Sequence, residues 1–504
     1  MSDQSRALPD RPSLRYLKLE AKRRLSAGEF ATLHQAQLAI AREHGLSSWT
    51  ALKEHIEAAG PVSHALTQVR WIMSRFAAAE TPQWSPPDEE ELRQHFDDRY
   101  LSLVPPDWLI RMFSTLAERL REDLADVRAE PLRLRARLAD LRVEAATEAD
   151  PPYRLHQLQF YPLEKKVNDP RVAAPPTSTS GVVPEEATSV AAASFAELGL
   201  VGLIVAGATG DGSVWVTARG WANLDQHEVL RPEHRFPAHS ITKLITATTV
   251  LRLVADGRVR LDEPANAYLR TVRLADDAVT VRELLSHTGG VDNPASMFAD
   301  HVPDLVSVTG PVAACSGTRG TFAYGHGEYA LLGQLIADVT ASRYEQAATR
   351  MVLEPLGMTN SWFPHSCPAT EVVTGHRLTD EGVFEREPTQ VSIVPAAGGL
   401  WTTAADLVRF GLAWSSLLPD ALAREALRPQ AERNDGPGGQ AGLGWMLVLP
   451  KDIAGHPGAG PGSSASLIIR PGLASPGGGQ PWVVLTNRRV LVEPINERLA
   501  LPIT

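Results

Sequence analysis

Residues 236–243 read Phe236-Pro237-Ala238-His239-Ser240-Ile241-Thr242-Lys243, and this stretch predicts the fold of the C-terminal part of the chain. A serine stands three residues before a lysine, at the start of an apolar run over residues 244–251. Residues three apart on a helix share one face, so the two side chains are expected to be neighbours. The helix N-terminus also directs free N–H groups and a positive dipole end at whatever Ser240 attacks. This arrangement is typical of a serine nucleophile with an amine as proton acceptor.

Lysine is a rare residue in this part of the chain. Residues 167–504 contain twenty-three arginines and two lysines, one of which is Lys243. A guanidinium keeps its proton in proteins whereas an ammonium can lose it, so a lysine is expected where a base is needed. A Ser-x-x-Lys pattern also arises by chance in many proteins, and the sequence blocks around it therefore decide its weight.

Five further blocks accompany the serine and lysine in a fixed order. They are Leu261-Asp-Glu-Pro264, Val279 to Gly290, Tyr324 to Gly333, Ala396 to Leu407, and Gly442-Leu-Gly-Trp445 followed by His456 to Gly460. Together they resemble the serine β-lactamase-like superfamily, above all its class C branch with the family VIII carboxylesterases and D-amino-acid peptidases. The resemblance covers residues 190–504. It implies a β-lactamase/penicillin-binding-protein-like fold, in which an antiparallel sheet flanked by helices is joined to a mostly helical lobe.

By this resemblance, Ser240 is expected to be the nucleophile and Lys243 its partner. Tyr324 corresponds to the tyrosine of the family's Tyr-x-Asn motif, and His456 opens the motif on the strand beside the nucleophile. The backbone N–H groups of Ser240 and Ala459 are expected to form the oxyanion hole. A tyrosine has a pKa of about 10, which a nearby Lys243 ammonium would lower. The pair can then share the proton of Ser240, and which of the two is the formal base stays open.

Two positions depart from the β-lactamase pattern. His326 stands where the tyrosine motif has Asn, and His456 stands where the third motif has Lys. The resemblance places His326 and Gly458 among the substrate-binding residues, although packing explains a histidine at 326 equally well. The loss of a permanent cation at 456 disfavours an anionic β-lactam, and a histidine there is typical of the esterase-like members. The sequence thus favours an esterase. A peptidase, amidase, transacylase or weak β-lactamase of the same superfamily, or an inactive binding or regulatory protein, are the alternatives.

Composition sets limits on the class of protein. With 504 residues the chain is too long for one core, so several domains are expected. The 59 acidic and 49 basic residues give a net charge of -10, which argues against a nucleic-acid surface. The two cysteines, Cys315 and Cys367, have no metal or redox spacing. No apolar run is long enough for a signal peptide or a membrane span, so we expect a cytoplasmic enzyme that uses a small acyl substrate and no metal or cofactor.

The N-terminal part predicts two smaller domains of a multidomain α+β protein. Residues 1–60 show helical periodicity in three segments and resemble a short helical module at the front of varied bacterial proteins, a candidate for docking a protein partner. Residues 62–166 predict three helices, near 65–79, 89–96 and 107–120, followed by strands at 132–138, 141–145 and 154–160 that alternate apolar and charged residues. Helices before a curved sheet resemble a cystatin-like or NTF2-like cone, without a catalytic motif. Residues 167–192, rich in Pro, Ser, Thr and Ala, predict a linker to a hydrolase domain at 193–504.

Overall fold

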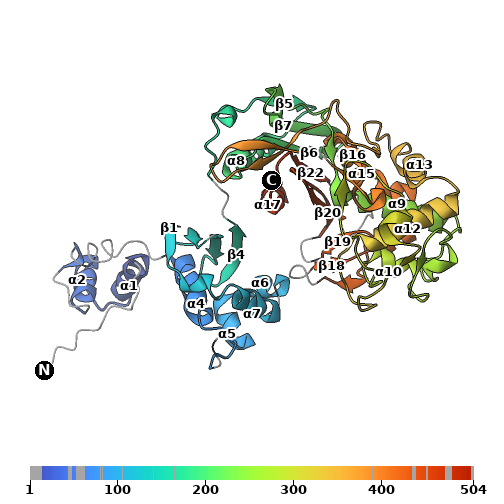
Figure 1. Cartoon of the computed structure of the whole chain (residues 1–504). Coiled ribbons are helices and arrows are strands. Elements are labelled where there is room, and N and C mark those ends of the chain that lie inside the picture. Colours follow the sequence, from blue (N-terminus) through green and yellow to red (C-terminus); the bar gives the residue numbers. More distant parts are fainter. Residues whose placement is uncertain are drawn as a thin grey trace. The chain divides into compact units, whose positions relative to one another are not determined.

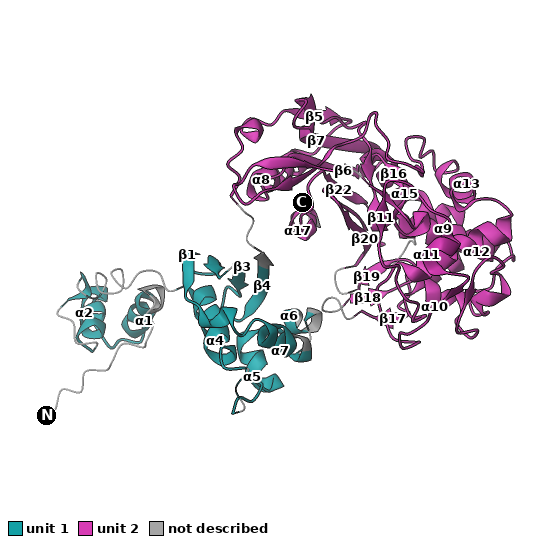
Figure 2. Cartoon of the chain, viewed as in Figure 1, with its two compact units in different colours: residues 1–163 teal, residues 164–504 magenta. Residues whose placement is uncertain are grey.

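The computed structural model divides the chain into two compact units, Met1–Leu163 and Glu164–Thr504 (Figure 2). Buried apolar residues form separate cores in the two units. The structure describes residues 14–43, 48–50, 52, 63–79, 81, 83–104, 106–139, 141–162, 166–388, 390–433, 439–449, 452–471 and 480–500.

The first unit begins with a small helical module. Helices α1 (Leu14–Ser26) and α2 (Leu33–Glu43) bury Leu17, Ala21 and Ile40 against each other. The spacing of these residues is that of a helix with one apolar face, as predicted. The third predicted helix, after Ser48, falls mostly on residues outside the described ranges.

The rest of the first unit places helices before strands, as the change of periodicity predicts. The helices are α4 (His64–Phe76), α5 (Glu89–His95), α6 (Asp98–Leu103) and α7 (Pro106–Thr115). The antiparallel sheet has the order β1-β2-β3-β4, formed by Leu124–Ala129, Arg133–Leu138, Leu141–Thr147 and Leu155–Pro162. In β2 the leucines and the alanine are buried while the arginines are exposed, so the alternation correctly marks the core face. The resemblance to a cystatin-like or NTF2-like domain stays a prediction.

A ten-stranded sheet forms the centre of the second unit (Figure 1). Its order is β17-β18-β19-β20-β21-β22-β6-β7-β5, with β8 (Glu228–Val229) paired to β7, and the paired neighbours are antiparallel. The strands are β5 (Thr177–Ser180), β6 (Gly202–Ala208), β7 (Val214–Asn223), β17 (Ala431–Glu432), β18 (Gly439–Ala441), β19 (Met446–Val448), β20 (Ile453–Gly460), β21 (Ser463–Ile469) and β22 (Trp482–Thr486).

The predicted linker at 167–192 is wrong, because this segment belongs to the second unit. Residues 177–180 form β5, which pairs with β7 at the edge of the sheet. Asp169 accepts a hydrogen bond from the backbone N–H of Phe384 at 3.0 Å. Helix α8 begins at Glu185, inside the same segment. Threonine suits an exposed edge strand and alanine suits a helix, so a composition typical of linkers here encodes regular structure.

Helices cover both faces of the sheet. Along β6, Leu203 and Val205 face a core formed with α8 (Glu185–Glu197) and α17 (Glu493–Ala500), whereas Ile204 and Ala206 belong to the main core with α15 (Ala404–Ala413). A strand that is apolar on both sides is expected where both faces are covered. This double burial explains why β6 shows no polar alternation.

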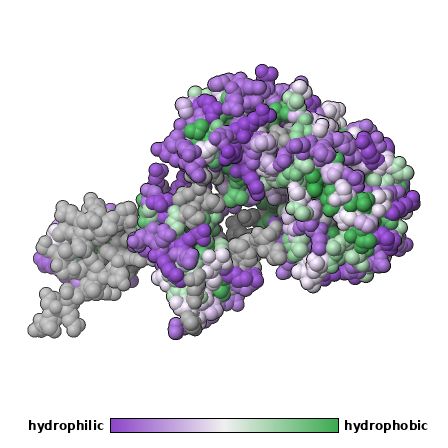
Figure 3. All heavy atoms as spheres, viewed as in Figure 1, coloured by the Kyte–Doolittle hydropathy of each residue, from purple (hydrophilic) through white to green (hydrophobic). Residues whose placement is uncertain are grey.

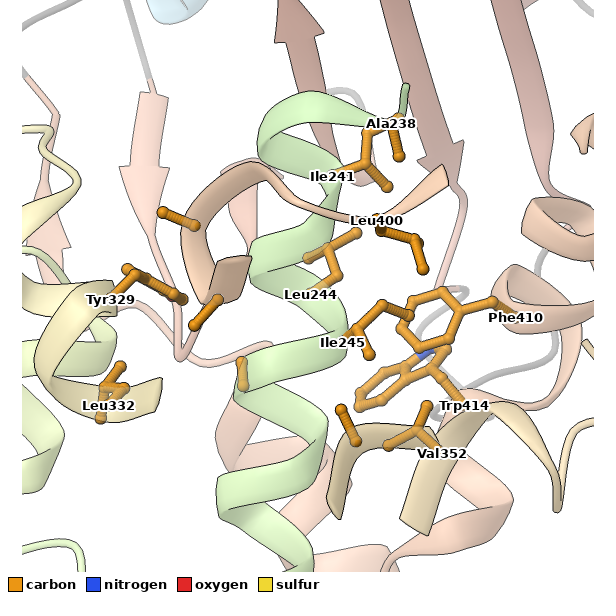
Figure 4. Close-up of a cluster of buried hydrophobic side chains, with 14 of the residues drawn as sticks. Ala238, Ile241, Leu244, Ile245, Tyr329, Leu332, Val352, Leu400, Phe410 and Trp414 are labelled. Carbon is orange, nitrogen blue, oxygen red and sulfur yellow. The ribbon is translucent and has the colours of Figure 1, made fainter. Parts of the chain in front are cut away.

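Helix α9 (Thr242–Ala255) runs through the main core and is buried nearly all round. Figure 4 shows Ile245 facing Phe410 and Trp414, while Tyr329 and Leu332 lie on the other side of the helix. Within α9, the hydroxyl groups of Thr248 and Thr249 donate to the carbonyl groups of Leu244 and Ile245, one turn earlier, both at 2.8 Å. The helix is therefore held rigidly behind Ser240.

Residues 260–390 form the lobe beside α9. Its helices are α10 (Val281–Leu285), α11 (Leu305–Thr309), α12 (Gly327–Thr340) and α13 (Tyr344–Ala348), and they are followed by α14 (Pro395–Gly398). Among the described residues, no helix has both the length and the apolarity to cross a membrane. On the face shown in Figure 3, hydrophilic and hydrophobic residues are interspersed over the surface of the second unit.

Candidate active site

Ser240 lies in a tight turn between a strand and a helix. Residues His239–Ile241 form one 3₁₀ turn directly before α9, and the preceding strand β9 (Phe236–Pro237) pairs with β16 (Trp401–Thr402). The backbone N–H of Ala238 donates to the carbonyl of Leu400 at 2.8 Å. His239 has a φ of 48°, a left-handed conformation that is unusual for a residue with a side chain. The chain thus turns sharply at the serine, which is half-buried.

Lys243 is fully buried behind Ser240, with none of its surface exposed. Its Nζ lies 3.3 Å from Ser240 Oγ, 3.2 Å from His326 Nδ1 and 3.0 Å from the carbonyl oxygen of Ala397. Burial lowers the pKa of Lys243 to about 7, against the opposing effect of the Glu328 carboxylate. The lysine therefore loses and regains its proton near neutral pH.

The tyrosine motif brings two more predicted residues to the lysine. Lys243 Nζ lies 5.0 Å from the centroid of the Tyr324 ring, and that ring lies 5.8 Å from the His456 ring. His326 precedes α12, and its backbone N–H donates to Asn293 Oδ1 at 2.5 Å. Burial, with smaller effects from Lys243 and a neighbouring histidine, lowers the pKa of His326 to about 3. His326 is thus a neutral neighbour of the lysine and not a second cation.

His456 lies on β20, the strand beside the nucleophile, and only 2% of it is exposed. Its Nδ1 lies 2.6 Å from the carbonyl oxygen of Pro457. A carbonyl only accepts, so Nδ1 carries the proton and Nε2 of the neutral ring is free to accept. Burial and then the charge of Lys243 hold the pKa of His456 well below its usual value. The position that has a cationic lysine in β-lactamases is therefore uncharged here.

The end of β20 lies directly against the turn that carries Ser240. A methyl group added at Gly458 would come within 2.4 Å of the carbonyl oxygen of Ala238. One added at Gly460 would come within 2.2 Å of the His239 ring, whose Nε2 lies 2.8 Å from Ser463 Oγ. Strand β19 pairs with β20 only at residues 453–455, so the segment with Ala459 continues past β19 and meets the serine turn. The two backbone segments predicted for the oxyanion hole are thus adjacent.

Two residues near the lysine were not predicted to take part in the site. Glu328, in the first turn of α12, is buried next to Lys243. His287, in the turn after α10, has its Nδ1 3.7 Å from Glu328 Oε2. The sequence did contain a signal for Glu328, because it is a single acidic residue directly before the apolar run at 329–332. An acid at that point of a buried helix requires a functional or structural reason.

The second unit also has a cavity of about 600 Å³ apart from this site. It is lined by α12 on the Ala330–Ala337 face, by the start of α13 and by residues 393–396, and none of the predicted catalytic residues lines it. Ser240 and its neighbours lie instead where the sheet, through β20, meets the lobe, through α9 and α12.

Comparisons with known proteins agree with this fold. The model of the Beta-lactamase family matches residues 188–501. The chain is 28% identical over 303 residues to Esterase EstB of Burkholderia gladioli, which covers 51% of this chain and 77% of that protein. It is 28% identical over 221 residues to Penicillin-binding protein 4 of Amycolatopsis lactamdurans, which covers 40% of this chain and little more than half, 56%, of that relative. The D-amino acid amidase of Ochrobactrum anthropi SV3 has the same fold, with a TM-score of 0.54 at 22% identity, over 62% of this chain and 95% of that one.

Proposed function

The chain belongs to the Beta-lactamase family of serine hydrolases, and on that premise we propose that it is an esterase that acts through an acyl-enzyme on Ser240. The observation that supports this most is the 3.3 Å separation of Ser240 Oγ from the buried Nζ of Lys243. A nucleophilic serine needs a base within hydrogen-bond reach. A fully buried amine that loses its proton near pH 7 fits that role.

The contacts of Lys243 define which form of the amine is reactive. A neutral amine has two N–H groups and one lone pair. In the tautomer of His326 with its proton on Nε2, the carbonyl of Ala397 and Nδ1 of His326 take the two N–H groups at 3.0 and 3.2 Å. The lone pair is then left for the hydroxyl proton of Ser240. These two neighbours orient the base, which lowers the cost of reaching the reactive geometry.

In the proposed reaction, Ser240 Oγ attacks the ester carbonyl as its proton moves to Lys243 Nζ. The carbonyl electron pair moves onto the oxygen, which the N–H groups of Ser240 and Ala459 stabilise. Collapse of this intermediate breaks the bond to the alcohol, which takes the proton from Lys243, with the Tyr324 hydroxyl as a further carrier. Water then repeats the sequence on the acyl-enzyme and releases the acid.

The preference for an ester follows from the neutral state of His456. A β-lactam or peptide substrate of this family carries a carboxylate, and the strand beside the nucleophile offers it no fixed charge at this position. A neutral imidazole, with Nε2 free to accept, suits an uncharged acyl compound. The similarity to a protein named as an esterase supports the same class.

The test compares kcat/KM for p-nitrophenyl butyrate and nitrocefin on the purified protein. We expect measurable ester hydrolysis and little or no hydrolysis of the lactam. The control is Ser240→Ala, which should lose both turnover and labelling by a fluorophosphonate probe while it keeps its melting temperature. A clear preference for nitrocefin would replace the esterase with a lactamase, and labelling that persists in Ser240→Ala would place the active serine elsewhere.

A further inference from the structure

Glu328 is a buried acid that the proposed reaction does not use. It lies in the first turn of α12, and 1% of it is exposed. Among the described residues, neither side-chain oxygen has a partner that meets the criteria of a hydrogen bond. A buried carboxylate in this state is costly, so its presence calls for a reason. Burial raises the pKa of Glu328 to about 7, more than the nearby backbone N–H groups and Lys243 lower it.

Three elements bring titratable groups together at this point. Glu328 comes from α12, Lys243 from α9, and His287 from the turn after α10. His287 Nδ1 accepts a hydrogen bond from the N–H of Gly325 at 3.4 Å and lies 3.7 Å from Glu328 Oε2. A ring nitrogen that accepts carries no proton, so Nδ1 offers no hydrogen-bond donor to the carboxyl group. This neighbour therefore does not offset the burial that favours a protonated Glu328.

Other titratable groups are close to this cluster or lie on elements packed against α12. They are Tyr324, His326 and Tyr329 around Lys243 and His287, His456 on β20, Arg282 and Glu283 on α10, Asp304 at the start of α11, and Tyr344 and Glu345 on α13. Arg282 and Glu283 form ion pairs with Asp262 and Arg319. The groups on α11 and α13 line the separate cavity. Lys243 is therefore the charged group that acts on Glu328.

We infer that Glu328 is a positioning residue that controls the protonation of Lys243. The amine with a carboxylic acid and the ammonium with a carboxylate hold the same number of protons, so one proton is shared by the buried pair. When Glu328 holds the shared proton, Lys243 is the free amine that accepts the proton of Ser240. The pair then holds two protons, one on the Lys243 ammonium and one on the Glu328 acid, until the ammonium gives its proton to the leaving alcohol. Glu328 itself ends each half-reaction unchanged. This inference rests on the proposed role of Lys243 as base.

The test measures the rate of fluorophosphonate labelling against pH, which needs no knowledge of the substrate. The amine is the reactive form, so the rate of the wild-type protein should fall as the pH drops through about 7. Glu328→Gln keeps the shape and removes the negative charge that raises the pKa of Lys243. The pH at which the labelling rate of this variant falls, the acidic limb of its profile, should be lower by about one unit. At low pH its labelling, relative to its own maximal rate, should then be about tenfold faster than that of the wild-type protein. Glu328→Asp should keep the limb near its original position.

The matched control is Glu345→Gln, on α13, which also packs against α12 but does not act on Lys243. Its limb should not move. A limb that stays in place in Glu328→Gln, or moves to higher pH, overturns the inference. If Glu328→Gln does not fold, infrared spectra of Ser240→Ala decide instead. The carbonyl band of a protonated carboxyl group should be present just below pH 7 and disappear as the pH rises through about 7. Spectra that lack this band refute the shared proton. A wild-type protein that is not labelled at any pH refutes the proposed function.

Discussion

Lys243 Nζ has three neighbours within 3.3 Å and no contact with solvent. Any side chain that replaces the lysine must therefore fit into the same small buried space. Lys243→Arg keeps the positive charge but cannot supply a free base, and its guanidinium is larger. We therefore expect it to lose as much activity as Lys243→Ala, about 10²–10⁴-fold in kcat/KM, the usual contribution of general base catalysis. The measurement is ester hydrolysis by both variants, with melting temperatures to confirm folding.

The control for this substitution is Lys166→Arg, at an exposed lysine of the same unit, which should be as active as the wild-type protein. Near-normal rates in Lys243→Arg would make the lysine a purely electrostatic residue. The sequence predicted that Lys243 and Ser240 are neighbours because their spacing is local. It did not reveal the state of His326 or Glu328, since burial by distant segments sets the pKa of both groups.

Among the elements, the contact between β20 and the serine turn has no room for added volume. Gly458→Ala would place a methyl group 2.4 Å from the carbonyl oxygen of Ala238, and backbone rather than a flexible side chain would have to move. We expect β20 to move away from the turn and the oxyanion hole to widen, with a loss of about 10²–10³-fold in kcat, comparable to removal of one donor. The measurement is kcat for the ester, together with a circular dichroism spectrum that stays unchanged.

Gly210→Ala is the matched control, since an added methyl group there meets no atom within 4 Å. An active Gly458→Ala variant would show that β20 does not shape the oxyanion hole. Strands with clean alternation, such as β2, were predictable from sequence. β1 was not, because its register shifts between Ala125 and Arg128 and Asp126 adopts a φ of 51°, which disrupts a period of two.

For the whole molecule, the two units predict where the chain can be cut. Residues 164–504 contain the sheet and the cores on both of its faces, so this fragment should fold and hydrolyse esters at a rate close to that of the full chain. Residues 193–504, the boundary suggested by composition, lack β5 and most of α8. This shorter fragment should melt at a clearly lower temperature or fail to fold, because Ala187 and Ala191 no longer cover their face of the sheet.

Both fragments can be compared with the full chain by ester hydrolysis and thermal melting. If fragments 164–504 and 193–504 were equally stable, residues 167–192 would be a linker after all. The sequence identified the hydrolase region through six ordered blocks, but it could not place the edge of the domain. The residues at that edge, such as Asp169 and the strand at 177–180, are recognised as structural only through partners far along the chain.

The strand order has a consequence for how the protein is made. β6 is the first strand along the chain that helices cover on both faces of the sheet. Its two neighbours in the sheet are β7 and β22, and β22 is the last strand in the described residues. During synthesis, the hairpin of β6 and β7 emerges from the ribosome with one apolar edge open, and it stays open until the C-terminal residues follow. Such an edge readily pairs with other chains. The newly made enzyme should therefore depend on chaperones until its final strand closes the sheet, and a ribosome that stalls shortly before residue 482 should leave an aggregation-prone chain.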